Sequence, residues 1–109
     1  MVSTQVLNIF SGLFEIVQEQ AHITAKDKGF WQTPLTHGES IALMHFELSQ
    51  ILGAIRAGNP ESPQMLEFDS ATEKAADVVI RLMDWAQYYG FDLGDAIVAK
   101  LKYNDTRPR

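Results

Sequence analysis

Apolar residues recur at helical spacing along almost the whole chain, and this periodicity constrains the fold more than any other feature of the sequence. Near the N-terminus the repeat has intervals of three and four residues, and falls on Val6, Phe10, Leu13, Phe14 and Val17. This is the pattern of an amphipathic helix packed on one side. No stretch of useful length has the alternation of period two expected of a strand. The sequence therefore predicts an all-α fold.

Capping and breaking residues divide this pattern into four main helices. The predicted helices run from Ser3 or Thr4 to before Lys28-Gly29, from Thr36 to before Gly58-Asn59-Pro60, from Ser70 to Gly90, and from Asp92 to about Tyr103. The second and third begin with capping boxes, Thr36 with Glu39 and Ser70 with Glu73. We expect a four-helix, bundle-like architecture, with loops at residues 30–34 and 60–69.

Length and composition limit the classes of function. At 109 residues the chain has the size of one domain, about 100–150 residues, so we expect a single domain over residues 1–109. The absence of cysteine excludes a disulfide framework, a thiolate zinc site and a cysteine nucleophile. A net charge of −5 argues against a nucleic acid polymer or an anionic membrane as the partner.

The sequence also carries expectations about location and assembly. No run approaches the ~18 apolar residues of a membrane-spanning helix, and the N-terminus lacks the pattern of a signal peptide. We therefore expect a cytoplasmic protein. A lone domain of this size hides only a little over ~60% of the surface of its unfolded chain, so pairing with a second copy would enlarge a modest core.

Acidic side chains interrupt the apolar faces of the second and third predicted helices. Asp77 and Arg81 stand one turn apart in a stretch that is apolar nearly all round, and Asp84 follows. A carboxylate in apolar surroundings is costly unless it is paired or binds a metal. The residues thus allow either an Asp77–Arg81 ion pair facing solvent or a functional acid. Glu47 and Gln50 share one face of the second helix, and facing helices can converge such groups on a hard cation.

Several short motifs follow one another in a fixed order from about residue 22 to residue 108. They are Gly29-Phe30-Trp31, Gly38-Glu39-Ser40-Ile41-Ala42-Leu43, Glu47-Leu48-Ser49-Gln50, residues 76–84, and Gly90-Phe91-Asp92-Leu93 with the Lys100 to Pro108 ending. Together they resemble the MazG-like nucleoside triphosphate pyrophosphohydrolases. The resemblance implies an all-α fold that assembles as a homodimer or a dimer of dimers. It also implies Mg²⁺-dependent hydrolysis of a nucleoside triphosphate or deoxynucleotide, including non-standard ones, to the monophosphate and pyrophosphate.

The resemblance also implies a metal site of the form E-x-x-E on one helix and E-x-x-D on the next. Glu47 matches the first glutamate and Asp77 the closing aspartate, so both are expected to be catalytic and to hold Mg²⁺. Gln50 replaces the second glutamate, and its side-chain oxygen can still ligate the ion. Lys74 stands where E-x-x-D has glutamate, and an ammonium repels a metal. We hypothesise that Lys74 fills part of the vacated space, paired with Glu47 or Asp77.

Other candidate residues each have two interpretations. Glu73 either completes the metal site or serves the capping box with Ser70. Arg81 either reaches a phosphate or forms an ion pair with Asp77 or Asp84. Trp31, with Phe30, either stacks on a base or closes over the edge of the core.

The C-terminal cations and the remaining aromatic residues complete the prediction. Lys100 and Asn104, with Lys102 and Arg107 near them, resemble the phosphate-side cluster of the family, although cations also favour a helix C-terminus. The three histidines show no metal-ligand spacing and are interpreted as structural or surface residues. Trp85, Tyr88 and Tyr89 are expected to serve packing or subunit contact.

Gln50 and Lys74 also support a rival class of function. Because they remove two of the four anionic ligands, the same fold could serve as a non-catalytic nucleotide-binding or protein-interaction module. The enzyme interpretation requires that the unmodified chain already turns over, whereas the binding module does not.

Overall fold

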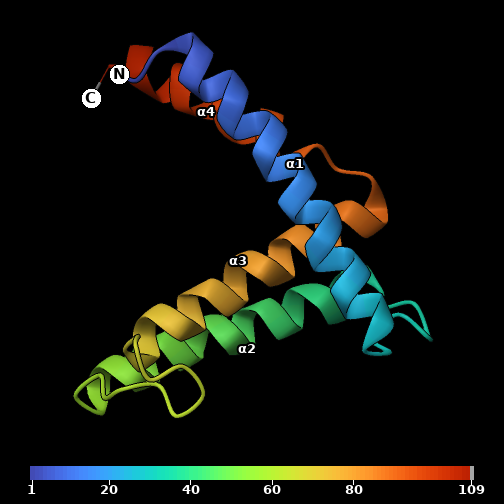
Figure 1. The fold of residues 1–109 in the computed structure, drawn as a ribbon, viewed down its shortest axis with the longest axis vertical. Coiled ribbons are helices and arrows are strands. Elements are labelled where there is room, and N and C mark those ends of the chain that lie inside the picture. The colour runs from blue at the N-terminus through green and yellow to red at the C-terminus, as the bar shows by residue number, and fades with distance from the viewer. Residues whose placement is uncertain (109) are drawn as a thin grey trace.

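A computed structural model describes residues 1–108 as four α-helices joined by short loops (Figure 1). The helices are α1 (Thr4–Asp27), α2 (His37–Arg56), α3 (Ser70–Tyr89) and α4 (Leu93–Thr106). Extended pairing within these residues is limited to one isolated antiparallel bridge between Glu61 and Asp69. The all-α prediction and the number of helices are therefore confirmed. None of the helices in residues 1–108 combines the length and apolarity needed to cross a membrane.

The four helices form two antiparallel pairs that open as a V (Figure 1). The α1/α4 arm holds the N-terminal half of α1 against α4, and the α2/α3 arm holds α2 against α3. The two arms meet at a joint, which we call the elbow, where residues 18–31 contact residues 84–91. The radius of gyration is 15.9 Å, against about 13 Å for a compact chain of this length. Within one copy, the helices thus leave an open interior angle.

Capping residues set the helix ends mostly where the sequence places them. The Ser3 hydroxyl accepts from the Val6 amide to cap α1, and Thr36 forms the expected capping box with Glu39 at the start of α2. The start of α3 differs from the prediction, because Asp69 is the cap and accepts from the Thr72 amide. An aspartate carboxylate caps as well as a serine hydroxyl does, so the helix begins one residue earlier than a Ser70 cap would allow.

The α1/α4 arm depends on a close approach at one glycine. A Cβ on Gly94 would lie 3.2 Å from the Ser11 carbonyl oxygen and 3.2 Å from the Phe14 ring. The Ser11 hydroxyl also donates to the Asp95 carboxylate. The first turn of α4 is thus fixed against the middle of α1.

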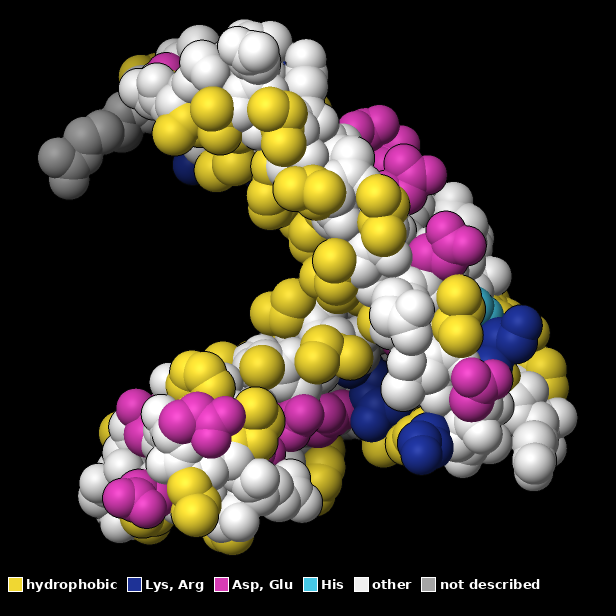
Figure 2. All heavy atoms as spheres, viewed as in Figure 1, with side chains coloured by type: hydrophobic (Ala, Val, Ile, Leu, Met, Phe, Trp, Pro, Cys, Tyr) yellow, Lys and Arg dark blue, Asp and Glu magenta, His cyan; other side chains and the backbone are white. Residues whose placement is uncertain are grey.

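Apolar side chains are distributed unusually between interior and surface. The buried apolar residues of the described chain are Leu7, Met83, Ala86 and Val98. A much larger set is exposed, and eight of its members lie along α1 or just before its first residue, several of them 50% exposed or more. We call this set the apolar face of α1, and it comprises Val2, Val6, Ile9, Phe10, Leu13, Ile16, Val17 and Ile23. Figure 2 shows apolar side chains along α1 bordering the open angle of the V.

Candidate functional site

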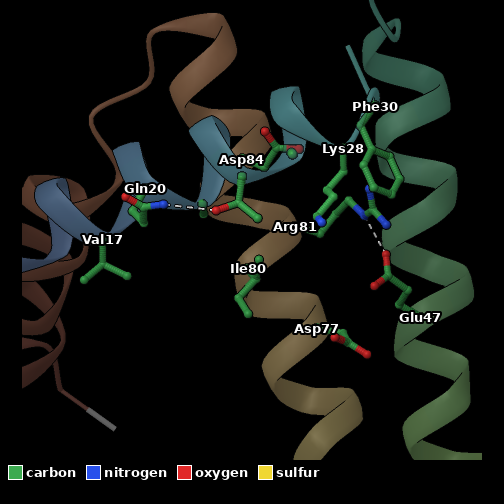
Figure 3. A pocket seen from close by; sticks show the side chains of 12 residues that line it. Val17, Gln20, Lys28, Phe30, Glu47, Asp77, Ile80, Arg81 and Asp84 are labelled. Atoms are coloured by element: carbon green, nitrogen blue, oxygen red, sulfur yellow. Dashed lines mark hydrogen bonds and ion pairs between the residues drawn. The ribbon is translucent and has the colours of Figure 1, made fainter. Parts of the chain in front are cut away.

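The main cavity lies on the inner side of the elbow, among α1, α2 and α3 (Figure 3). Its volume is about 390 Å³. Its lining combines three carboxylates with two cationic side chains on an otherwise mostly apolar wall: Val17, Gln20, Ala21, Thr24, Ala25, Lys28, Phe30, Glu47, Asp77, Ile80, Arg81 and Asp84. Both residues predicted to be catalytic, Glu47 and Asp77, belong to this lining and project from facing helices. The prediction that the two acids share one site therefore agrees with the geometry.

An ion pair joins the two helices across this cavity. Arg81 Nε of α3 donates to Glu47 Oε1 of α2 over 2.6 Å, and the side chains are 19% and 13% exposed. The guanidinium carbon lies 5.2 Å from the centre of the Phe30 ring, within range of a cation–π contact. The expected pairing of Arg81 with Asp77 or Asp84 is wrong, because Arg81 pairs with Glu47 across the α2/α3 interface and the Asp84 carboxylate is bonded by Trp31 and His22.

Burial and two neighbouring carboxylates disfavour the ionised form of Asp77. Burial raises the pKa of the Asp77 carboxyl, and the nearby Glu73 carboxylate raises it further. Glu47 acts in the same direction, against the opposing charges of Lys74 and Arg81. The site therefore favours a proton or another cation next to Asp77.

Glu73 is turned away from the cavity toward the 60–69 loop. The fully buried Ser62 hydroxyl donates to the Glu73 carboxylate and accepts from the amides of Gln64 and Met65 at 3.3 and 3.1 Å. Glu73 therefore does not form the expected capping box with Ser70. The loop holds its carboxylate instead.

Lys74 Nζ lies 3.6 Å from Glu73 Oε2. The hypothesis that Lys74 pairs with Glu47 or Asp77 is thus contradicted, since Arg81 takes Glu47 and Lys74 takes Glu73. Glu73 is the adjacent residue on α3, and the loop already holds its carboxylate. It is therefore the nearer anion for the Lys74 ammonium.

The predicted ligands do not gather into one preformed metal cluster. Gln50 is half-buried on α2, but the cavity lining includes neither Gln50 nor Glu73. Across residues 1–108 no group of three or more His, Asp or Glu side chains is placed to hold a metal. Mg²⁺ in proteins often takes one or two carboxylates and completes its shell with water and substrate phosphate. Glu47 and Asp77 fit that mode of binding.

A buried carboxylate of the cavity lining was not identified as a site residue from the sequence. Asp84 is 4% exposed, accepts two bonds from the Trp31 indole at 2.8 and 3.0 Å, and lies 2.8 Å from His22 Nδ1. The apolar run around Asp84 indicated an unusual acid. Its partners were hidden because they lie 62 and 53 residues earlier in the chain.

Trp31 completes the elbow as an aromatic cover. Its ring stacks on Tyr88 with centroids 3.9 Å apart, and His22 meets it edge-on. A smaller cavity of about 290 Å³ adjoins these three side chains. This arrangement is the one expected of a loop aromatic that closes over the edge of a core.

The C-terminal candidates lie in the other arm. Lys100 and Asn104 are exposed on α4, and the Lys100 ammonium lies 4.7 Å from the centre of the Tyr103 ring. Because α4 packs along the N-terminal half of α1, they do not line the cavity of their own chain. Any role at that site requires a second copy.

Comparisons with models of protein families, with curated proteins and with solved structures found no match to this chain. The resemblance to the MazG-like pyrophosphohydrolases therefore remains a hypothesis. Its support is the ordered motifs and the convergence of Glu47 and Asp77 on one cavity.

Proposed function

We propose that this chain is a MazG-like, Mg²⁺-dependent nucleoside triphosphate pyrophosphohydrolase that releases a nucleoside monophosphate and pyrophosphate. The observation that carries the proposal is the placement of Glu47 and Asp77. They come from two facing helices, line one cavity, and share it with the cationic side chains of Lys28 and Arg81. Carboxylates beside cations are the groups needed to hold a metal–polyphosphate complex.

Each charged group of the cavity has a distinct task in this proposal. When bound, Mg²⁺ would neutralise phosphate charge and position a water for in-line attack. Glu47 and Asp77 would hold the ion and orient that water once Arg81 has released the Glu47 carboxylate. Lys28 and Arg81 contact phosphate oxygens and keep an acidic protein from repelling an anionic substrate.

The proposal includes a homodimer, or a dimer of dimers. The apolar face of α1 contains Val2, Val6, Ile9, Leu13, Ile16 and Ile23 at intervals of four and three residues, with one interval of seven. That spacing is the seam of a helix that packs against another helix. A 24-residue helix is about 36 Å long, enough for an extended contact with a second copy. In such an assembly, α4 of one copy can bring Lys100 and Asn104 to the cavity of the other.

A second candidate function is a non-catalytic nucleotide-binding or protein-interaction module. The observation that favours it is that two of the predicted metal-binding acids are already paired with other side chains. Glu47 is held by Arg81 and Glu73 by Ser62 and Lys74, so that Asp77 alone of these three has no such ion pair. A binding module needs no free carboxylates, whereas the enzyme must release Glu47.

The test is pyrophosphate release from a panel of nucleoside and deoxynucleoside triphosphates, with Mg²⁺ and with EDTA. We expect turnover that requires Mg²⁺ and that falls by on the order of 100-fold in Glu47→Gln. Glu67→Gln, which changes an exposed glutamate of the 60–69 loop, is the matched control and should turn over like the unmodified chain. A folded sample that hydrolyses no nucleotide under any of these conditions refutes the enzyme and favours the binding module.

A further inference from the structure

We propose that the Arg81 guanidinium is the resident counter-ion of Glu47, and that a divalent cation reaches Glu47 only by displacing it. The displaced guanidinium then turns to the phosphates of the substrate. Metal and triphosphate would thus enter the cavity together. This inference rests on the proposed function and assigns a role to one side chain of its site.

Arg81 occupies the Glu47 oxygen that a metal ion would need, so the two cations compete for it. Arg81 Nε lies 2.6 Å from Glu47 Oε1, and both side chains are mostly buried, so solvent screens the pair only weakly. A metal ion bound to that oxygen would place a divalent charge against a guanidinium at hydrogen-bond distance. The two cations therefore exclude each other from this position.

The surroundings allow Arg81 to leave without losing all of its partners. Phe30 lies against the guanidinium at 5.2 Å and offers a cation–π contact that does not depend on Glu47. Arg81 itself lines the cavity of about 390 Å³, into which a planar guanidinium can turn. There its fork of donors matches phosphate oxygens in pairs.

The charge of the lining explains why metal and phosphate are coupled. Glu47, Asp77 and Asp84 face Lys28 and Arg81 in one cavity. Releasing Glu47 from its counter-ion without a replacement would leave three carboxylates lining one cavity with one of them newly unpaired. A divalent ion replaces the lost positive charge, and the freed guanidinium then needs an anion.

The experiment measures Mn²⁺ binding by calorimetry in the absence of nucleotide, for the unmodified chain, Arg81→Gln and Lys28→Gln. Both variants remove one positive charge from the same cavity, but only Arg81 is bonded to Glu47. We expect Arg81→Gln to bind Mn²⁺ about tenfold more tightly than the unmodified chain. The Mn²⁺ affinity of Lys28→Gln should rise by about threefold or less, because this variant changes only the electrostatic field of the cavity and no bond to Glu47.

A second measurement uses inorganic triphosphate at saturating Mn²⁺. Arg81→Gln should bind it about tenfold more weakly, the opposite direction to its effect on the metal. Arg81→Lys, which keeps the charge but loses the planar fork, should bind Mn²⁺ with an affinity between those of the unmodified chain and Arg81→Gln. If Arg81→Gln fails to fold by circular dichroism, the lysine variant decides whether weakening this contact tightens the metal.

Equal gains in Mn²⁺ affinity for the Arg81 and Lys28 variants would overturn the proposal, since the field alone would account for them. So would unchanged or weaker Mn²⁺ binding by the Arg81 variants, or no Mn²⁺ binding by any of the proteins. The first two outcomes are distinct from failure of the proposed function, because the metal is measured without turnover, whereas no Mn²⁺ binding by any of the proteins would count against both. Hydrolysis by a chain whose Arg81 variants do not tighten Mn²⁺ would leave the function standing and remove this inference.

Discussion

The elbow buries polar side chains, whereas the α1/α4 arm leaves apolar side chains exposed to solvent. In the elbow, the buried Gln18 amide donates to Gln87 and to the Phe91 carbonyl, and the buried Asp84 accepts from Trp31. Along α1, by contrast, the apolar face is left in solvent. Soluble monomers rarely expose large contiguous apolar patches. The comparison teaches that buried polar groups of the elbow find partners within one chain, whereas the apolar face of α1 is left uncovered by the rest of residues 1–108.

The largest expected effect tests the elbow. Asp84→Ala leaves the Trp31 indole and His22 without their shared acceptor in a buried place. We expect a loss of about 3 kcal/mol in the free energy of unfolding, measured by urea denaturation. Asp105→Ala, an exposed aspartate of α4, should change the same quantity by less than about 0.5 kcal/mol. Equal losses in the two variants would mean that the elbow is no more self-contained than the arms.

The next effect tests the arms. Leu13 is 58% exposed at the middle of the apolar face of α1, so Leu13→Asp should harm an assembly far more than a single chain. We expect the dissociation constant of the dimer, measured by analytical ultracentrifugation, to rise by about 100-fold, or ~2.7 kcal/mol.

The matched control for the arms is Asn8→Asp, which adds a charge to α1 outside that face and should leave the dissociation constant nearly unchanged. An unmodified chain that sediments as a monomer at all concentrations would contradict the comparison for the arms.

The smallest effect concerns the cavity between the two regions. Because the folded chain raises the pKa of Asp77, the ionised carboxylate lowers stability above that raised pKa. Asp77→Asn should therefore be more stable than the unmodified chain near neutral pH. The gain should shrink as the pH falls through the raised pKa toward the ordinary aspartate value, where both states bind the proton. Urea titrations across that range, with Asp105→Asn as control, measure it, and a gain that does not depend on pH would contradict this origin.

The sequence predicts local structure well and long-range partners poorly. The hydroxyls of Ser3 and Thr36 fix helix starts because a cap bonds to amides only two or three residues away. The convergence of Glu47 and Asp77 could also be predicted, since each stands in an apolar stripe on a helix that packs against the other.

The partners of these acids could not be predicted in the same way. Arg81 pairs with Glu47 on α2 and not with an acid on its own helix. Ser62 contacts Glu73 because the 60–69 loop folds back onto α3. Those choices depend on how helices pack and on which groups become buried together. A periodic pattern does not encode either.

The chain carries two tryptophans, and both lie near the elbow. The Trp31 indole donates to Asp84 while its ring stacks on Tyr88, and the Trp85 indole donates to His37 Nδ1 over 3.1 Å. Tryptophan emission from this protein therefore originates near the elbow alone. Fluorescence would follow local rearrangement of the elbow with no added label, while association through the apolar face of α1 would have to be detected by size.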